Sequence, residues 1–263
     1  MVYAMIVVYN KECEDSETLK SIQQWKDKIK LVVFDNSTIQ TNNKEYCENK
    51  GIQYFTVGEN VGLSKAYNYV IQRLPLNDED FVIVLDDDTE LTEQYIEEVL
   101  QSVDLNKDIL LPIVYSGDMI LSPTNIKYKC GSVVVKDIKE LNLNSLSAIN
   151  SGMVVSANVY KKLCYNEELF LDCVDHEFMK QIRENKFSVS VMKSEIQQNY
   201  SRGEKPRIES ALFRFGLFKK DFKTYCQLCD AELYYKVSIL KFVLSYTLKY
   251  RSFKFIKLMM TNK

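Results

Sequence analysis

The sequence has little of what several classes of protein require. Its 263 residues include one histidine, eight glycines and four prolines. So few glycines and prolines argue against long disordered linkers. The formal net charge of -2 gives no general attraction for nucleic acid, and no zinc-finger or RNA-binding motif is found. We therefore expect a globular chain with no nucleic-acid partner.

Signals for export and for zinc binding are also lacking. Of the seven cysteines only Cys226 and Cys229 form a C-x-x-C pair, and the single histidine, His176, is far along the chain from them. A structural zinc site needs four such ligands. The opening MVYAMIVVYN has no basic residue and does not resemble a signal peptide. No uncharged stretch reaches the ~20 apolar residues of a membrane span. These features predict reduced thiols and a cytoplasmic chain.

What the sequence does contain is an alternation of apolar runs and amphipathic stretches. The pattern predicts strands at residues 1–10, 29–38, 51–56 and 81–88, with helices at 16–28, 63–74 and 92–103. Ser16 is the expected cap of the first helix. From residue 110 onward, strands are expected at 110–116, 127–135 and 187–194. Helices are expected in the second parts of the segments 148–163 and 166–186. Alternation of this kind is typical of an α/β fold with a mostly parallel central sheet covered by helices.

Polar side chains follow three of the predicted strands. They are Tyr9-Asn10, Asp35-Asn36-Ser37 and Asp86-Asp87-Asp88. Each cluster alone could be turn chemistry, because Asn, Asp and Ser favour turns. Ligands of parallel sheets, however, bind beyond the carboxyl ends of the strands. Three adjacent aspartates also repel one another, so a helix N-terminus, basic side chains or a divalent cation with its phosphate ligand should compensate them.

Six segments in order resemble the family 2 glycosyltransferases of the GT-A fold, in particular their bacterial rhamnosyltransferase-like branch. The segments are VVYN, VVFDNST, GENVGLSKAYN, VLDDDTEL, NSGMVVSANVY and FLDCVDHEF, within residues 1–200. The resemblance implies an inverting enzyme that moves a sugar from a UDP- or dTDP-sugar donor to a hydroxyl of a glycan or polyprenyl-linked acceptor. It further implies a place in bacterial cell-surface polysaccharide synthesis.

The resemblance also implies roles for individual residues. Asp35 would accept a hydrogen bond from the base N3–H, and Lys65 would reach a phosphate. In the D-x-D pair, Asp86 would contact the ribose and Asp88 a Mn²⁺ or Mg²⁺ ion, which prefers oxygen ligands. The complete set of implied donor-binding residues is Tyr9, Asn10, Asp35, Asn36, Asn60, Gly62, Lys65, Asn68, Asp86 and Asp87.

A second acidic cluster is expected to supply the general base. Asp175 matches the base position of the family motif, and Glu177 is expected to assist it or to bind the acceptor. Asp172 is a third carboxylate, one helical turn before Asp175. The competing interpretation is that these charges compensate a helix N-terminus. A catalytic role for His176 is the less favoured alternative to a structural one.

One departure from the family concerns the metal. Many members carry a histidine after the last strand that completes the metal coordination, and here the segment reads VMKSEIQQNYS. Glu195, Gln197, Gln198 or water would have to take that position. A non-catalytic GT-A subunit that supports a partner transferase is therefore the alternative function. A phosphatase of the haloacid dehalogenase type also ends a strand in D-x-D. It is disfavoured, because its motif has Thr or Val two positions after the second aspartate, whereas here Asp88 is followed by Thr89 and then Glu90.

The composition changes towards the C-terminus. We expect a GT-A domain at 1–205 and a helical, basic and apolar extension at 206–263. Residues 233–263 contain seven Lys or Arg and no Asp or Glu, among many Tyr, Phe, Leu and Ile. This composition suits peripheral contact with an anionic membrane or a lipid-pyrophosphate acceptor. A helical cap or a homodimer contact is the competing interpretation.

Overall fold

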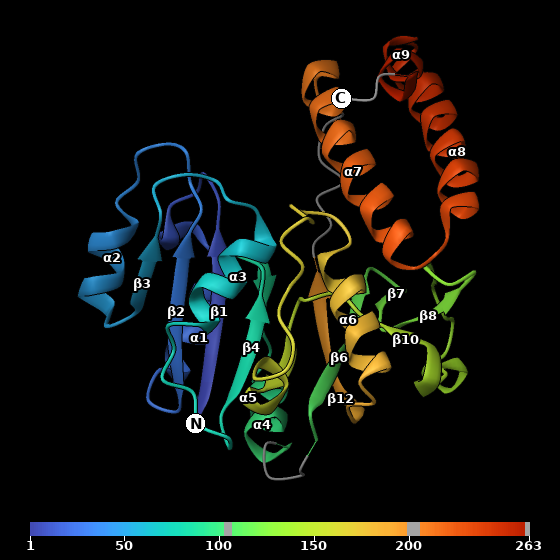
Figure 1. The fold of residues 1–263 in the computed structure, drawn as a ribbon. Helices are drawn as coiled ribbons and strands as arrows, with labels where there is room; N and C mark the ends of the chain where they lie inside the picture. Colours follow the sequence, from blue (N-terminus) through green and yellow to red (C-terminus); the bar gives the residue numbers. More distant parts are fainter. Residues whose placement is uncertain (103–106, 199–205, 261–263) are drawn as a thin grey trace.

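The computed structural model describes residues 1–102, 107–198 and 206–260 (Figure 1). It confirms a mostly parallel central sheet covered by helices. Strands of the main sheet are β1 (Val2–Val8), β2 (Ile29–Asp35), β3 (Gln53–Thr56), β4 (Phe81–Leu85), β5 (Thr89–Glu90), β6 (Ile109–Ser116), β7 (Met119–Ser122), β11 (Met153–Ser156) and β12 (Val189–Gln198). Their order in space is β3-β2-β1-β4-β11-β6-β12-β5, with β7 paired to β6. A small second sheet contains β8 (Thr124–Lys127), β9 (Gly131–Val133) and β10 (Leu146–Ser147).

Helices connect the strands and lie on both faces of the main sheet. They are α1 (Glu17–Ile22), α2 (Asn43–Lys50), α3 (Leu63–Ile71), α4 (Glu93–Ser102), α5 (Ala157–Tyr160), α6 (Val174–Glu184), α7 (Ile208–Leu228), α8 (Glu232–Tyr250) and α9 (Lys254–Met260). Short 3-10 turns occur at Cys13–Asp15, Gln23–Trp25, Ile138–Glu140 and Leu143–Ser145. Within the described ranges no helix is both long and apolar enough to cross a membrane.

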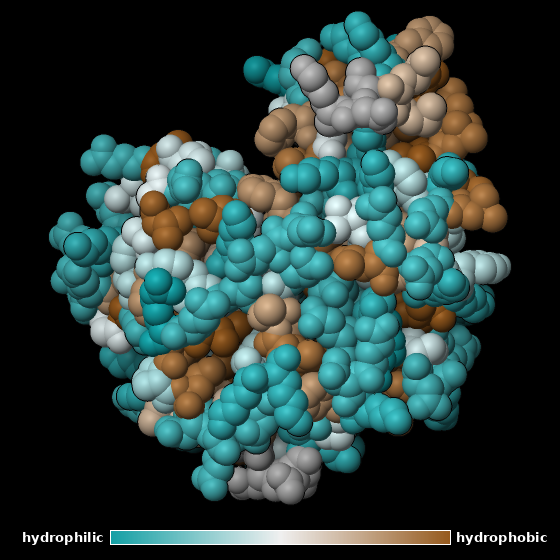
Figure 2. Space-filling view, viewed as in Figure 1, coloured by the Kyte–Doolittle hydropathy of each residue, from teal (hydrophilic) through white to brown (hydrophobic). Residues whose placement is uncertain are grey.

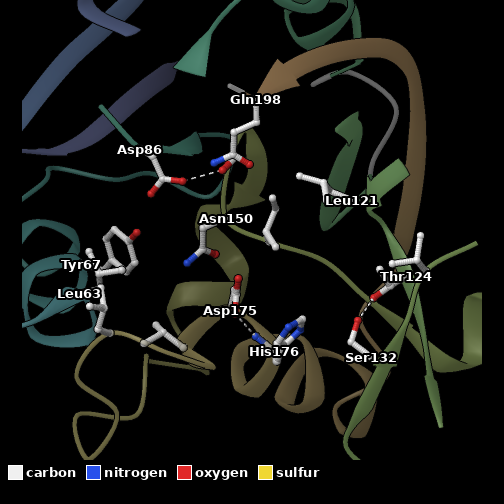
Figure 3. Close-up of a pocket in the computed structure, with 15 residues that line it drawn as sticks. Leu63, Tyr67, Asp86, Leu121, Thr124, Ser132, Asn150, Asp175, His176 and Gln198 are labelled. Carbon is white, nitrogen blue, oxygen red and sulfur yellow. Dashed lines mark hydrogen bonds between the residues drawn. The ribbon is translucent and has the colours of Figure 1, made fainter. Parts of the chain in front are cut away.

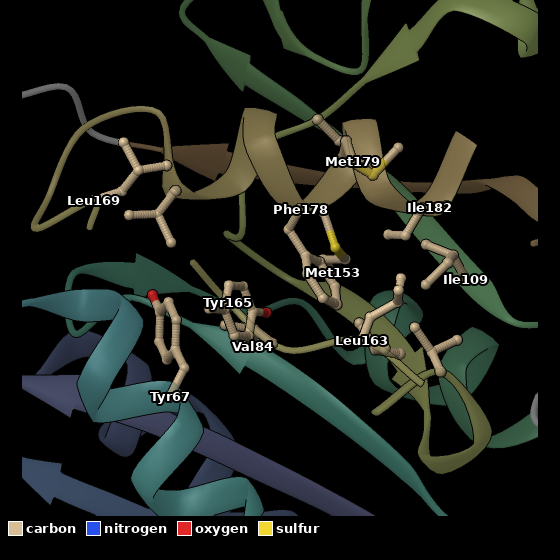
Figure 4. Packing of buried hydrophobic residues seen from close by; sticks show 14 of the residues in the cluster. Tyr67, Val84, Ile109, Met153, Leu163, Tyr165, Leu169, Phe178, Met179 and Ile182 are labelled. Atoms are coloured by element: carbon tan, nitrogen blue, oxygen red, sulfur yellow. The ribbon is translucent and has the colours of Figure 1, made fainter. Parts of the chain in front are cut away.

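The central strand β1 explains why the sequence opens with an unbroken apolar run. All seven of its residues are buried, and alternate side chains enter two different cores. Met5 packs in the core beneath α3 and α6, while Ile6 packs in the core beneath α1 and α4. Figure 4 shows the first core, where Phe178 of α6 lies against Met153 of β11. A strand covered on both faces has no polar side to display.

The parallel register brings the predicted polar clusters to one edge. Val8 of β1 pairs with Asp35 of β2, and Ile6 pairs with Leu85 of β4. The three strands therefore end side by side, and Tyr9 and Asp86 follow at the same edge. The expectation that these clusters meet is confirmed, because parallel strands present all their carboxyl ends together.

Local expectations were met in part. The hydroxyl of Ser16 accepts a hydrogen bond from Leu19 N, as expected of a cap. The strand expected at 127–135 is found only as β9, Gly131–Val133, because Tyr128 and Lys129 have positive φ angles of 53° and 71° and turn the chain between β8 and β9. Helix α2 was not expected: much of its surface is polar, and only Asn43 and Cys47 are buried.

The C-terminal helices form a small core of their own beside the main domain. Phe215 of α7, Ile239 and Val243 of α8, and Phe255 of α9 are buried in it. Further along α7, Tyr225 enters the main core beneath α6. The expected domain boundary at 205/206 meets a segment outside the described residues and remains a prediction. In Figure 1 the helices α7–α9 project past the carboxyl edge of the sheet.

Candidate active site

Two adjoining pockets open at the carboxyl edge of the sheet. The larger has a volume of about 520 Å³ and lies over the ends of β1 and β4. The smaller, of about 300 Å³, lies between β4, α6 and the small sheet (Figure 3). Leu63, Asp86, Leu171 and Gln198 line both pockets. A ligand group in one pocket would therefore lie next to a ligand group in the other.

The larger pocket collects most of the residues expected to bind the donor. Asn36 is buried, its side-chain nitrogen donates to Asn60 Oδ1 at 2.9 Å, and its Oδ1 accepts from Val61 N at 2.8 Å. These bonds tie the end of β2 to the loop before α3. The predicted residues that line this pocket are Tyr9, Asn36, Asn60, Gly62, Asp86, Asp87 and Asp88.

Gly62 lets the start of α3 approach the loop before α6. Its φ is +81°, and a Cβ built there would lie 2.5 Å from the carbonyl oxygen of Phe170. The next residue, Leu63, donates its backbone N–H to the same oxygen at 2.7 Å. Only glycine accepts both this φ and this contact without strain. The wall of the pocket formed by Gly62 and Phe170 therefore requires a glycine at position 62.

Asp35 lies at the strand end but lines neither pocket. Its carboxylate accepts hydrogen bonds from Ser37 N at 3.0 Å, Thr41 at 2.9 Å, Asn43 at 2.9 Å and Tyr54 at 3.1 Å. Burial would raise the pKa of Asp35, but the hydrogen bonds from Ser37, Asn43 and Thr41 outweigh it and lower the pKa. The carboxylate holds the loop after β2 together, and its predicted bond to a nucleobase stays a prediction.

Three other predicted donor residues also lie outside the lining of the two pockets. The side chain of Asn68 donates to Tyr165 O at 2.9 Å and to Glu167 at 3.0 Å, and accepts from Tyr165 N at 3.0 Å. Lys65 is exposed on α3. Asn10 accepts hydrogen bonds from the loop after β2. Asn68 therefore fixes residues 165–167, and the donor contacts expected of Asn68, Lys65 and Asn10 stay predictions.

The carboxylate of Asp86 sits where the two pockets meet. Its Oδ2 accepts a 2.6 Å hydrogen bond from the Ser151 hydroxyl. Burial, reinforced by the negative charges of Asp88 and Asp175, raises the pKa of Asp86 to about 6, although the Ser151 bond opposes the shift. Such an excess of negative charge is what a cation would relieve.

Asp87 has a different role from its neighbours. Burial raises its pKa, and the ammonium of Lys11, 3.5 Å from Oδ2, counters that shift. Its backbone oxygen accepts from the Ser16 hydroxyl at 2.8 Å, and Thr18 donates to the backbone oxygen of Asp86 at 2.6 Å. Hydroxyls at the start of α1 therefore fix the backbone of the three aspartates. Lys11 compensates the charge of Asp87.

The residues present fit a hard divalent cation. Gln198 lines both pockets, and its buried Oε1 has no hydrogen-bond partner within the described residues. Figure 3 shows Gln198 and Asp86 pointing towards one another across the smaller pocket. A carboxylate oxygen of Asp88 and the amide oxygen of Gln198, beside the negative charge of Asp86, are ligands of the kind that Mg²⁺ and Mn²⁺ prefer. No cluster of three Cys, His, Asp or Glu side chains suited to a metal occurs in the described chain. Of Glu195, Gln197 and Gln198, only Gln198 lines these pockets.

Asp175 lies in the smaller pocket, in the first turn of α6. The helix begins after Cys173, which has a left-handed φ of 63°. Asp175 Oδ1 accepts from the backbone N–H of His176 at 2.7 Å, and the ring Nδ1 of His176 lies 2.7 Å from the Ser147 hydroxyl. The carboxylate is thus oriented by its own helix and faces the cavity that Asp86 also lines.

Glu177 does not reach either pocket. It lies two positions after Asp175, so the two side chains leave the helix on different sides. Only 4% of Glu177 is exposed, its Oε2 accepts from Gln181 at 2.7 Å, and burial raises its pKa. Its expected assistance to the base is therefore not supported by its position.

Helix α7 supplies residues that the sequence analysis missed. Phe213, Arg214 and Leu217 line the larger pocket. Arg214 forms an ion pair with Asp172, including a 2.7 Å bond from Nη2 to Oδ1. These residues follow the segments that carried the family resemblance, so no motif pointed to them. Asp172 is thereby engaged by Arg214 and lines neither pocket.

The smaller pocket also contains polar atoms that lack partners. Within the described residues, the Tyr67 hydroxyl, Asn150 Oδ1 and Gln198 Oε1 are buried without a hydrogen-bond partner. Buried polar groups are nearly always paired, so a cluster of unpaired ones indicates a missing ligand or water. Asn150, Ser151 and Gly152 begin one of the six segments that carry the family resemblance, and the fold places them beside the triple aspartate, where Ser151 contacts Asp86.

The Glycosyl transferase family 2 sequence model matches residues 3–162, more than half of the chain. The chain belongs to this family. A curated relative, the dTDP-rhamnosyl transferase RfbF of Shigella flexneri, is 29% identical to this chain over 184 residues. The match covers 67% of this chain and 61% of that relative, so the chain spans about three fifths of the relative's length.

Solved glycosyltransferases share the fold. GalNAc-T7, determined with UDP, GalNAc and Mn²⁺, superposes with a TM-score of 0.55 at 15% identity, over 76% of this chain and 44% of its own. Glucosyl-3-phosphoglycerate synthase from Mycobacterium tuberculosis, determined with Mn²⁺, UDP-glucose and glycerol 3-phosphate, gives 0.53 at 10% identity, over 86% and 80%. At these identities the likeness establishes the α/β GT-A fold alone.

Proposed function

We propose that this glycosyltransferase moves a sugar, with inversion, from a pyrimidine nucleoside diphosphate sugar to an acceptor hydroxyl. The observation that carries the proposal is the junction of the two pockets at Asp86. The larger pocket holds the residues expected to bind the donor, and the smaller holds the expected base, Asp175. The similarity to a dTDP-rhamnosyl transferase makes dTDP-rhamnose the first donor to test.

In this proposal the larger pocket binds the nucleoside diphosphate. Tyr9, Asn36 and Asn60 bind the nucleoside side, Asp86 the ribose, and Asp88 with Gln198 the divalent cation. When bound, the cation supplies positive charge that neutralises the diphosphate leaving group. Arg214 on α7 adds a guanidinium to the wall of the same pocket.

The smaller pocket binds the acceptor and removes its proton. Asp175 accepts the proton of the attacking hydroxyl, a contribution typically worth ~10²–10⁴ in rate. The unpaired Tyr67 hydroxyl and Asn150 Oδ1 are placed to hydrogen-bond the acceptor. A single base opposite the leaving group permits one displacement, which inverts the configuration of the sugar carbon.

The acceptor class follows from the family resemblance. We propose a glycan or a polyprenyl-linked saccharide, in the synthesis of a bacterial cell-surface polysaccharide. A cytoplasmic location at the inner face of the membrane would agree with such an acceptor. The alternative is a non-catalytic subunit that has kept the fold, which the missing family histidine keeps open.

The test has a binding arm and a chemical arm. Thermal unfolding is measured with dTDP-rhamnose, other dTDP- and UDP-sugars, and purine nucleotide sugars, each with and without Mn²⁺. A true donor at a hundredfold excess over Kd should stabilise the fold by about 2.7 kcal/mol. NMR of the product, or of the hydrolysed donor, then gives the anomeric configuration. Stabilisation only by purine nucleotides, or retention of configuration, would overturn the proposal. Donor binding without any turnover would favour the non-catalytic subunit.

A further inference from the structure

Helix α8 is apolar on two separate sides. One side carries Ile239 and Val243, which are 5% and 1% exposed and pack with Phe215 of α7 and Phe255 of α9. This side is accounted for by the core of the C-terminal helices. The second apolar side has no such partner within the described residues.

The second side is a regular stripe. Leu233, Val237, Leu240, Leu244 and Leu248 are 76%, 47%, 48%, 50% and 78% exposed. Their spacing of four, three, four and four residues places all five within an arc of about 80° on the helix. We call these five residues the aliphatic stripe. Exposed apolar residues scattered singly are ordinary, but a contiguous row marks a binding surface.

Charge identifies the partner of the aliphatic stripe. Lys236 and Lys241 leave the helix on opposite sides of the stripe, each within about 90° of its centre. Beyond the helix the chain continues with Arg251, Lys254 and Lys257, and residues 233–260 contain no Asp or Glu. A row of aliphatic side chains bordered by cations matches a surface with acyl chains below and phosphates above.

We propose that the aliphatic stripe binds the surface of an anionic lipid bilayer, with α8 lying parallel to it. The leucines and the valine enter the acyl boundary, and the lysine stems extend so that their ammonium groups meet lipid phosphates. Phe253, just before α9, and Met260, the last residue of α9, are also exposed, at 80% and 76%. Figure 2 shows apolar side chains, in brown, gathered along the right-hand edge of the helices that project beyond the sheet.

Two observations connect this surface with the active site and disfavour another occupant. Helix α7, which packs against α8, lines the larger pocket through Arg214. Attachment through α8 would therefore hold the pocket close to the bilayer. A second copy of the chain is a poorer partner for the stripe, because pairing two stripes would bring their bordering lysines together.

The experiment is flotation of the purified protein with phosphatidylcholine vesicles, prepared with and without phosphatidylglycerol. The wild type should float with the anionic vesicles and not with the neutral ones, and high salt should reduce the bound fraction. Two independent variants test the surface: Leu240→Ser with Leu244→Ser, and Lys236→Glu with Lys241→Glu. Each should weaken binding by about tenfold or more.

Matched controls change equally exposed residues elsewhere. Met119→Ser with Leu143→Ser controls for lost aliphatic surface, since these residues are 49% and 60% exposed. Lys26→Glu with Lys30→Glu controls for charge. Both controls should bind like the wild type, and thermal unfolding should confirm that all four proteins fold.

Three results would overturn the proposal. The first is that the wild type does not bind anionic vesicles. The second is that the leucine and lysine variants bind as well as the wild type, and the third is that the control variants lose as much binding as these two. A dimer that the leucine pair abolishes, seen by sedimentation without any vesicle binding, would assign the stripe to a second copy. The assay contains no donor and no acceptor, so its failure would leave the proposed sugar transfer untouched.

Discussion

The carboxylate of Asp221, on α7, accepts a 2.7 Å hydrogen bond from the backbone N–H of Leu171, a residue that lines both pockets. The same carboxylate accepts from the N–H groups of Phe170 at 3.1 Å and Asp172 at 2.9 Å. Asp221 is fully buried. A C-terminal helix therefore fixes the loop that leads into α6 and the proposed base.

Replacing Asp221 should loosen that loop. Asp221→Ala would leave three backbone N–H groups without their acceptor, and hydrogen bonds to a charged group are worth about 1.5–3 kcal/mol each. We expect a loss of roughly 3 kcal/mol or more in the free energy of unfolding, measured by urea denaturation. Asp221→Asn, whose single amide oxygen replaces part of the set, should lose less. Equal stability of all three proteins would show that the anchor does not matter.

The general-base assignment predicts a separation of binding from chemistry. Asp175→Asn keeps the size and hydrogen-bonding capacity of the side chain, so donor affinity measured by calorimetry should change little. Single-turnover transfer should fall by ~10²-fold or more, the usual scale of a lost base. Glu177→Gln should cost much less, because Glu177 lines neither pocket.

Asp172→Asn is the second control, since Asp172 lines neither pocket although its ion-pair partner Arg214 lines the larger one, and it should reduce transfer far less than Asp175→Asn. If Glu177→Gln abolishes transfer while Asp175→Asn stays nearly active, the base has been assigned to the wrong residue. If none of the three variants alters transfer, the acidic cluster is structural.

The cation assignment predicts that two ligands weaken together. Asp88→Asn removes one charged oxygen from the proposed donor set, so Mn²⁺ and a nucleoside diphosphate should both bind more weakly. Titration calorimetry of dTDP or UDP with and without Mn²⁺ measures both effects. Asp118→Asn, an exposed carboxylate in the turn after β6, is the control and should change neither. Unaltered Mn²⁺-dependent binding by Asp88→Asn would refute the assignment.

Two glycines with nearly the same φ separate backbone strain from steric contact. Gly58 has φ +78° with no atom within 4 Å of a built Cβ, whereas at Gly62 the Cβ would meet Phe170. Gly58→Ala should cost only the strain of a left-handed residue, about 1 kcal/mol. Gly62→Ala should cost roughly 1–3 kcal/mol more and should also weaken donor binding. Equal losses of unfolding free energy would mean that the loop before α6 moves aside freely.

The buried Glu177 predicts a pH dependence of stability. Burial raises its pKa, so the folded state holds the proton more tightly than the unfolded chain does. The stabilisation this provides is complete below the unfolded pKa of ~4.3 and is lost as the pH rises through the folded pKa. Glu177→Gln cannot titrate, so the wild type should lose stability relative to it as the pH rises above the unfolded pKa and through the raised folded pKa. A difference that stays constant with pH, in parallel urea titrations, would contradict this.

Much of the framework could be predicted from the sequence because local chemistry is sufficient for it. The doubly buried run of β1, the Ser16 cap and the polar ends of three strands each follow from residues close together in the chain. Because β1, β2 and β4 run parallel, their carboxyl ends lie at one edge of the sheet. Tyr9, Asn36 and Asp86 could therefore be grouped from the sequence alone. The resemblance to the family added Asp175 through a motif of a few residues.

The remaining features depend on contacts between segments far apart in the sequence. Asp35 and Glu177 have acidic side chains like those of Asp86 and Asp175, but the first is enclosed by four hydrogen bonds and the second turns away on its helix. Arg214 and Asp221 reach the site from α7, and no sequence motif indicated either residue. Burial, facing direction and the pairing of charges are properties of the packed chain, so only the tertiary structure decided which carboxylates face the pockets.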